Sequence, residues 1–184
     1  MKKKLDNSWQ RYYGPDYPEL VERYDKTVEL VVPPALIDIG CAQGLLPFLV
    51  GERREGFTKL VGIDNCEEVL NEGLKCLIET PNTVRLFKMN AEDVKFEDGR
   101  FSTVSLCEIL EHVEDVEPVV REALRVLRPG GRLITSVPVE LTLSRAHVRV
   151  FRSLEELTDL FDGYIDWKGG YQLRRWYFAW GDKK

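Results

Sequence analysis

The most constraining feature of the sequence is a regular alternation between short apolar runs and stretches in which apolar residues recur at helical spacing. Short apolar runs bounded by Gly, Asp or Pro are typical of buried strands. Strands that alternate with helices form a parallel sheet with helices on both faces. We therefore predict an α/β fold with a doubly wound, mostly parallel sheet in a single domain. The predicted strands cover 35–39, 59–63, 84–88, 101–106, 132–137, 164–168 and 174–180.

Helical spacing of apolar residues predicts the helices between these strands. Leu70, Leu74, Leu77 and Ile78 form the expected apolar face of one of them. Another carries Val120, Leu124 and Leu127 and is stopped by the Pro-Gly-Gly sequence at 129–131, because Pro and Gly end helices. The predicted helices cover 20–31, 45–54, 70–78, 120–127 and 154–161.

Two local signals refine the C-terminal part. Ser153 is a good N-cap for the last helix, and Glu156 three residues later completes a capping box. The last two predicted strands flank Gly169-Gly170 with only a short connection. A parallel pair needs a long crossover, so we expect these strands to form an antiparallel hairpin.

Composition excludes several classes of protein. The formal net charge of −5 disfavours generic binding to a nucleic-acid backbone. No apolar run approaches the ~20 residues of a membrane span, and the basic start at residues 1–4 is not followed by the apolar stretch of a secretory signal. The cysteines are widely spaced, which is typical of reduced thiols in a cytoplasmic protein. They are Cys41, Cys66, Cys76 and Cys107.

A strand followed by a glycine-containing turn carries the first chemical signal. Asp38, Gly40 and Gly44 lie where the first predicted strand passes into a helix, and glycines there let a ligand approach the backbone closely. Asp64 ends the second strand, 20 residues after Gly44, where a carboxylate can accept both hydroxyls of a ribose. The pair indicates a cofactor that contains a nucleoside. The alternative is that Asp64 only caps the following helix.

Three further segments follow the third and fourth strands and lead into the fifth, at 89–93, 105–113 and 124–134. With these segments, residues 35–162 resemble the class I S-adenosylmethionine-dependent methyltransferases. The resemblance implies a seven-stranded sheet with the last strand inserted antiparallel. It also implies S-adenosylmethionine as cofactor and methyl transfer by in-line displacement.

The resemblance implies the following cofactor contacts. The glycine loop would hold the methionine part, Asp64 the ribose, and the loops after the next strands the adenine and the sulfonium end. A tyrosine of the segment before the first strand would also touch the cofactor. The residues implied are Tyr13, Asp38, Gly40, Cys41, Ala42, Gly44, Asp64, Asn65, Cys66, Asn90, Ala91, Glu92, Cys107, Glu108 and Ile109.

Two positions depart from the family pattern. Ala42 stands where the family commonly has glycine. Because alanine disfavours positive φ, we expect the turn to form without a positive φ there. Asn90 stands where the family usually has Asp; its side-chain oxygen can still accept from the adenine amine, but without charge.

Glu108, Glu111, His112 and His147 are the candidate reactive groups near the acceptor. The candidate catalytic residues are His147, His112 and Glu108, with a histidine as general base for a hydroxyl acceptor. We expect no metal. The alternative is a metal held by all four residues, similar to the methyltransferases that modify the 3′-terminal 2′-hydroxyl of small RNAs.

Basic and aromatic side chains suggest partners. Arg145, Arg149 and Arg152 could bind an anionic acceptor or an RNA end, with Arg174-Arg175 nearby on the hairpin, or they form a solvated basic face. Residues 1–34 would form an N-terminal arm and helix that folds over the cofactor as a lid, and 35–184 the cofactor-binding domain. The aromatic residues of the arm, which could instead anchor it on the core, are Trp9, Tyr12, Tyr13 and Tyr17.

A small-molecule acceptor fits the limited cover that residues 1–34 and 138–152 can provide. Two other functions are weighed against this one: a nicotinamide-dependent oxidoreductase, which the two glycines support poorly, and a non-catalytic partner subunit that binds the cofactor. The aromatic terminal strands could support a homodimer.

Overall fold

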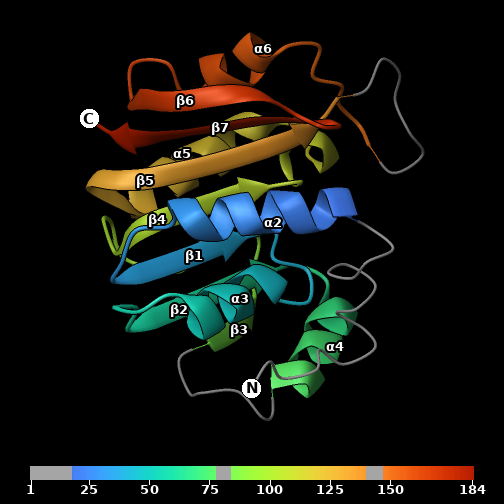
Figure 1. Ribbon diagram of the computed structural model, residues 1–184, viewed down its shortest axis with the longest axis vertical. Helices are drawn as coiled ribbons and strands as arrows, with labels where there is room; N and C mark the ends of the chain where they lie inside the picture. The colour runs from blue at the N-terminus through green and yellow to red at the C-terminus, as the bar shows by residue number, and fades with distance from the viewer. Residues whose placement is uncertain (1–17, 78–83, 140–146) are drawn as a thin grey trace.

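The computed structural model describes residues 18–77, 84–139 and 147–184. Over these residues the chain forms a seven-stranded sheet with the order β3-β2-β1-β4-β5-β7-β6 (Figure 1). The helices are α2 Pro18–Leu30, α3 Leu45–Arg53, α4 Glu67–Leu77, α5 Val116–Val126 and α6 Leu154–Thr158, with 3₁₀ turns η1 Leu110–His112 and η2 Asp159–Phe161. The strands are β1 Ala35–Ile39, β2 Lys59–Asp64, β3 Val84–Lys88, β4 Phe101–Cys107, β5 Leu127–Pro138, β6 Ile165–Leu173 and β7 Trp176–Lys183.

The pairing confirms the predicted topology. β1 to β5 pair in parallel, whereas β7 is antiparallel to both of its neighbours, β5 and β6. The last strand is therefore inserted between two earlier ones. The doubly wound α/β fold and the terminal antiparallel hairpin are both as expected.

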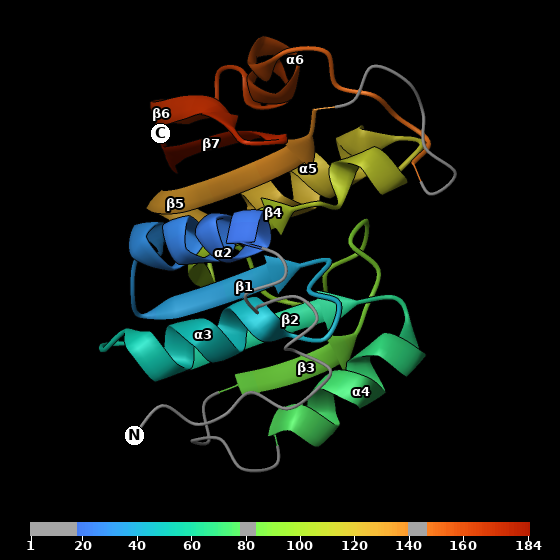
Figure 2. The ribbon, with the colours of Figure 1, turned by 45° about the vertical axis from the view of Figure 1, so that its right-hand side comes forward.

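Two apolar cores lie on opposite faces of this sheet. Successive side chains of a strand point to opposite faces, and β1 shows the consequence. Ile37 and Ile39 belong to the core under α5, whereas Leu36 belongs to the core under α2 and α3. The two views show α2 and α3 on one face and α5 behind the sheet (Figure 2). By the same alternation, Asp38 faces α2.

The C-terminal hairpin turns at a different place from the one predicted. Gly169 and Gly170 lie inside β6, and the turn lies at Arg174 and Arg175, where Arg174 has a φ of 57°. A Cβ built on Gly169 would lie 2.3 Å from the ring of Trp180. Glycine is needed there for close packing of the two strands and not for a turn.

Two helices also differ from expectation. In α4, Leu70 of the predicted apolar face is buried but Leu74 is 45 % exposed, and Gly73 packs closely, since a Cβ built on it would lie 2.2 Å from the Gln43 carbonyl oxygen. Ile78 lies outside the described residues. α5 ends at Val126, so Leu127 begins β5 and is not on the helix face.

Ser153 caps α6 as predicted, accepting from the Glu156 backbone N–H at 3.2 Å. The Glu156 carboxylate, however, accepts from the N–H of Arg152 at 2.7 Å, one residue before the cap. The capping box therefore closes on the preceding residue. In the described part of the chain, no helix has the length and apolar character needed to cross a membrane.

Candidate active site

The strand order reverses between β1 and β4, and the candidate site lies at the carboxyl ends of these strands. In open α/β sheets a crevice forms at such a reversal, because the neighbouring connections run to opposite faces. The turn after β1 is anchored there, since the N–H groups of Gly40 and Cys41 both donate to the Ile63 carbonyl oxygen at 2.9 Å. This anchoring fixes the glycine turn against the end of β2.

The glycine turn requires its glycines. Gly40 and Gly44 have φ angles of 77° and 73°. A Cβ on Gly40 would lie 2.8 Å from Ile109 Cδ1, and one on Gly44 would lie 2.6 Å from Leu86 Cδ2. Ala42 also has a positive φ, 47°, so the expectation that the turn avoids it there is wrong.

Asp64 explains how Ala42 is held in that conformation. One Asp64 carboxylate oxygen accepts from the Ala42 N–H and the other accepts from the Cys66 N–H, both at 2.9 Å. Neither N–H belongs to α4, which begins at Glu67, so the carboxylate joins the glycine turn to the residue before the helix. Each carboxylate oxygen can accept a second hydrogen bond, so the half-buried group still has capacity toward the crevice.

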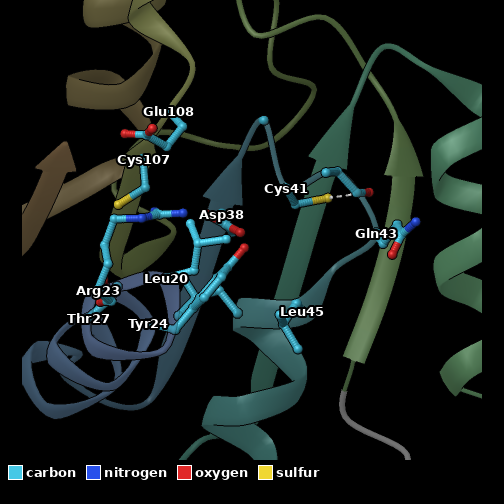
Figure 3. A pocket seen from close by; sticks show the side chains of 13 residues that line it. Leu20, Arg23, Tyr24, Thr27, Asp38, Cys41, Gln43, Leu45, Cys107 and Glu108 are labelled. Carbon is cyan, nitrogen blue, oxygen red and sulfur yellow. Dashed lines mark hydrogen bonds between the residues drawn. The ribbon is translucent and has the colours of Figure 1, made fainter. Parts of the chain in front are cut away.

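Two cavities adjoin at the turn, because Gly40, Ala42 and Glu108 line both. The inner cavity, of about 280 Å³, lies under α2 and is lined also by Arg23 and Asp38 (Figure 3). The outer cavity has about 850 Å³. Its lining includes the predicted ribose and adenine residues Asp64, Asn65, Cys66, Asn90, Ala91, Glu92 and Ile109, together with His112.

Arg23 is the functional candidate that the sequence analysis missed. It is 5 % exposed, and its guanidinium lies 4.8 Å from the ring centroid of Tyr24 and 5.3 Å from that of Trp176. Burial lowers the pKa of Arg23, but Glu108 and other acidic groups outweigh it, so the pKa lies above its usual value. Among the described residues, its Nε has no hydrogen-bond partner.

A sequence signal for Arg23 does exist. Leu20, Arg23, Thr27 and Val31 follow the spacing of one helix face. A charged residue inside a buried stripe needs a partner, because burying an unpaired charge is costly. That reasoning would have placed Arg23 in the site.

Asp38 lies in the same cavity as Arg23 and is 6 % exposed. Burial raises the pKa of Asp38 to about 7, although a hydrogen bond with Ser105 and the charge of Arg23 act in the opposite direction. The inner cavity therefore presents a cation and an ionisable carboxyl side by side.

Glu108 is held at the end of β4 in a left-handed conformation, with a φ of 59°. Its N–H donates to the Ser136 carbonyl oxygen at 2.9 Å. Its carboxylate accepts from the Ser136 hydroxyl at 3.1 Å and from the Trp176 indole N–H at 2.5 Å. These contacts direct Glu108 toward β5 and β7.

The four residues of the alternative metal site do not all converge. Glu111, His112 and His147 bring ligand atoms within 4.8 Å of one another, and the two histidine rings meet edge to face at 4.8 Å. Glu108 is not part of that group. The segment that carries His147 is tied to η1, because Val148 and Arg149 donate their N–H groups to the Glu111 carbonyl oxygen.

Among the basic residues that the sequence analysis singled out, Arg149 has a carbonyl partner and Arg174 has a carboxylate partner. Arg149 donates to the Glu114 carbonyl oxygen at 3.1 Å, and Arg174 pairs with Glu22 at 2.7 Å on the surface. Arg152 is exposed. Arg145 lies outside the described residues, as do Tyr13 and the other aromatic residues of the N-terminal arm.

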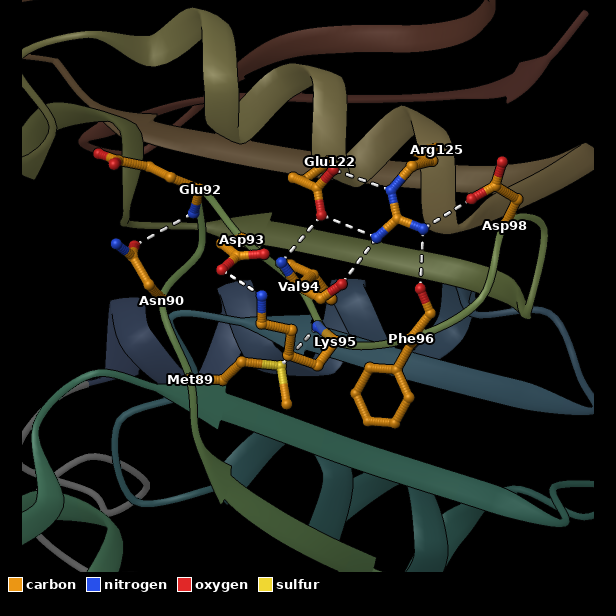
Figure 4. Close-up of polar contacts among 10 residues, drawn as sticks. All are labelled: Met89, Asn90, Glu92, Asp93, Val94, Lys95, Phe96, Asp98, Glu122 and Arg125. Atoms are coloured by element: carbon orange, nitrogen blue, oxygen red, sulfur yellow. Dashed lines mark hydrogen bonds and ion pairs between the residues drawn. The ribbon is translucent and has the colours of Figure 1, made fainter.

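The loop after β3 forms the far wall of the outer cavity (Figure 4). The Asn90 side-chain oxygen accepts from the Glu92 N–H at 3.1 Å, which shapes the turn. Arg125 of α5 then fixes the rest of the loop, donating to the Val94 and Phe96 carbonyl oxygens at 2.7 Å each. Residues 94–96 of this loop are thus held by a helix that lies far from Asn90 in the sequence.

Comparison with known proteins assigns a family. Residues 37–135, more than half of the chain, match the family of methyltransferase domains. A ubiquinone biosynthesis O-methyltransferase of Dechloromonas aromatica is 30 % identical over 65 % of this chain and 50 % of its own length. A demethylmenaquinone methyltransferase of Symbiobacterium thermophilum is 27 % identical over 77 % of this chain and 52 % of its own length.

The fold comparison agrees. The crystal structure of the N-methyltransferase NodS from Bradyrhizobium japonicum superposes with a TM-score of 0.77 at 16 % identity, over 91 % of this chain and 98 % of that one. The chain spans about half the length of the two curated relatives.

Proposed function

The chain belongs to the methyltransferase-domain family, and we propose that its crevice binds S-adenosylmethionine and directs the methyl group to a small-molecule acceptor. The observation that carries the proposal is that Arg23 and Asp38, a cation and a carboxyl group, both line the inner cavity. The α-amino-acid end of S-adenosylmethionine carries one carboxylate and one ammonium, which match this cation and this carboxyl.

The cavity fits the amino-acid end on a specific point. The Nε of Arg23 has no partner among the described residues, and leaving a buried charged donor unsatisfied is costly. A carboxylate from the cofactor would satisfy it. The ammonium would then lie toward Asp38, whose ionised form it stabilises.

The outer cavity fits the nucleoside end. Asp64 would accept from the ribose hydroxyls with the lone pairs that Ala42 and Cys66 leave available. Asn65 and Cys66 would flank the adenine, and Asn90, Ala91 and Glu92 would border it. The remaining residues implied by the resemblance, Cys41, Gly44, Cys107 and Ile109, lie on the turn or at the end of β4.

The bound cofactor supplies an activated methyl group whose leaving group is a neutral thioether, so no acid is needed. The protein's task is to hold the acceptor in line with the methyl, which can supply most of the rate. Where the acceptor is a hydroxyl, His112 or His147 would take its proton. Glu108 lines both cavities and would orient the acceptor or the sulfonium.

A small-molecule acceptor is supported by the two relatives, whose names place them in ubiquinone and menaquinone chemistry. The RNA-end alternative has less support. Its four-residue metal set is incomplete because Glu108 bonds to Ser136 and Trp176 instead. We therefore favour an aromatic or quinone-like hydroxylated acceptor.

Thermal unfolding with S-adenosylhomocysteine, S-adenosylmethionine and a nicotinamide dinucleotide tests the cofactor. A ligand at 100 times its dissociation constant stabilises by ~2.7 kcal/mol, which corresponds to a rise of ~5–11 °C for a chain of this size. We expect that rise with the two adenosyl compounds alone and its loss in Asp64→Asn.

Asp162→Asn is the matched control, since Asp162 also accepts from a backbone N–H but lines neither cavity. An absence of any shift in the unmodified protein would contradict the proposal. A panel of hydroxylated quinones and catechols then tests catalysis. If the protein binds S-adenosylmethionine but forms no S-adenosylhomocysteine with any of these acceptors, the non-catalytic partner subunit is favoured.

A further inference from the structure

Trp176, the first residue of β7, contacts both charged groups at the junction of the two cavities. It is 3 % exposed. Its ring face lies 5.3 Å from the Arg23 guanidinium carbon, and its indole N–H donates to the Glu108 carboxylate at 2.5 Å. One side chain therefore touches a buried cation with its face and a carboxylate with its edge.

Glu108 and Arg23 would be expected to form a direct ion pair. They carry opposite charges, and Glu108 is the largest electrostatic influence on Arg23. Among the described residues, however, no hydrogen bond joins them. One carboxylate oxygen of Glu108 accepts from Ser136 and the other accepts from Trp176. The Nε of Arg23 has no partner in the part of the chain that the structure describes.

We propose that Trp176 is a positioning residue that keeps Glu108 away from Arg23, so that Arg23 can bind the carboxylate of the cofactor. The inference rests on the proposed function. It gives the C-terminal hairpin a part in cofactor selectivity. This hairpin lies outside residues 37–135, the segment that matches the methyltransferase-domain family. Without the indole N–H, the Glu108 carboxylate is no longer held toward β7. The side chain can then turn toward Arg23, pair with it and compete with the incoming carboxylate.

The test compares two ligands that differ only at the end in question. S-adenosylhomocysteine carries the amino-acid end, whereas 5′-methylthioadenosine has the same nucleoside and thioether without it. In Trp176→Phe the ring face is kept and the N–H donor is lost. By calorimetry we expect the affinity for S-adenosylhomocysteine to fall about tenfold, as for loss of a hydrogen bond to a charged group. The affinity for 5′-methylthioadenosine should not change.

Two further variants distinguish positioning from general damage to the fold. Trp180→Phe makes the same substitution on the same strand, at a ring that packs on Tyr171 and Phe178, and should leave both affinities unchanged. Adding Glu108→Gln to Trp176→Phe removes the competing charge, so S-adenosylhomocysteine binding should recover.

Equal losses for both ligands, no loss for either, or no recovery in the double variant would overturn the inference. If Trp176→Phe does not fold, Ser136→Ala removes the other side-chain donor to Glu108 and should give the same ligand selectivity. Failure of the unmodified protein to bind either ligand would instead contradict the proposed function, so the two failures are distinguishable.

Discussion

At the scale of single residues, Asp38 and Asp64 show how position on a strand determines what a carboxyl group can do. Asp38 lies within β1 and points under α2, where burial raises its pKa to about 7. Asp64 is the last residue of β2, and two backbone N–H groups hold its carboxylate at the rim. Asp38 can therefore gain or lose a proton near neutral pH, while the Asp64 carboxylate offers hydrogen-bond acceptors at a fixed position.

We expect the affinity for S-adenosylhomocysteine to rise with pH up to about 7 and then level off. Ionised Asp38 binds the ammonium of the ligand far more strongly than the neutral carboxyl does, and below about pH 7 the free protein must first release that proton. Each unit below the pKa should then weaken binding by up to about tenfold. Calorimetry across this range measures the slope. A slope that persists in Asp38→Asn would assign the proton to another group.

Ala42→Gly should stabilise the free protein by up to ~1 kcal/mol. A left-handed conformation costs ~1–2 kcal/mol in a residue with a Cβ, and glycine avoids that cost. Part of the gain is lost because glycine makes the unfolded chain more flexible. Chemical denaturation measures the change. Gly44→Ala is the reverse test and should be destabilising, since its Cβ would meet Leu86. A destabilised Ala42→Gly protein would show that the Cβ of Ala42 makes contacts that matter.

At the scale of elements, α4 is placed by Gly73, which meets the glycine turn, together with the buried Leu70, whereas Leu74 is exposed. We expect Gly73→Ala to destabilise the protein by ~1–3 kcal/mol, as for overpacking in a tight contact. It should also weaken S-adenosylhomocysteine binding, because the added carbon displaces Gln43 of the glycine turn. Leu74→Gln, at the neighbouring exposed position, should change stability by no more than ~0.5 kcal/mol. Comparable effects of the two substitutions would contradict this packing.

Element types and their order could be predicted from the sequence, whereas several boundaries could not. Apolar runs and helical spacing are local signals, and they identified β1 to β5 and the helices between them. The position of the hairpin turn could not be predicted, because Gly169 lies inside β6 to make room for the ring of Trp180. That packing is a contact between two strands and leaves no local signal. Leu74 shows the same limit, because its spacing fits a buried face but the helix rotates so that Gly73 meets the turn.

The residues of the candidate site could also be predicted only in part. Motif positions such as Gly40, Asp64 and Asn90 were identified from the sequence, because the family pattern marks them by spacing. Arg23 and Trp176 lie outside that pattern, at 23 and 176 in a chain whose matched segment is 37–135. The place of Arg23 on a buried helix face is a local signal, but the role of Trp176 depends on α2 and β7 meeting beside β4 and β5, which no local signal records.

At the scale of the whole molecule, Arg125 links two layers. From α5 it holds the loop after β3 through two carbonyl oxygens and forms ion pairs with Glu122 and Asp98 at 2.7 Å each. Arg125→Met should destabilise the protein by ~1–3 kcal/mol, since it removes hydrogen bonds that satisfy half-buried groups. Faster hydrogen exchange at 94–98 should accompany the loss.

Arg121→Met is the matched control, because Arg121 lies one turn earlier on α5 and pairs only at 4.0 Å with the exposed Glu117. It should leave both stability and exchange unchanged. If Arg125→Met left exchange at 94–98 unaltered, the loop would be held by its other contacts.

The insertion of β7 between β5 and β6 has a consequence for how the protein is made. A chain emerges from the ribosome from its N-terminus, and folding can begin with the parts already released. β1 to β5 can pair before β7 exists, yet Trp176 enters only with that strand. A nascent chain that has not released residues 176–183 therefore has the glycine turn and Asp64 but lacks the contacts of Trp176 with Arg23 and Glu108. With the positioning role proposed for Trp176, full affinity for the cofactor would be acquired only when that strand has been translated.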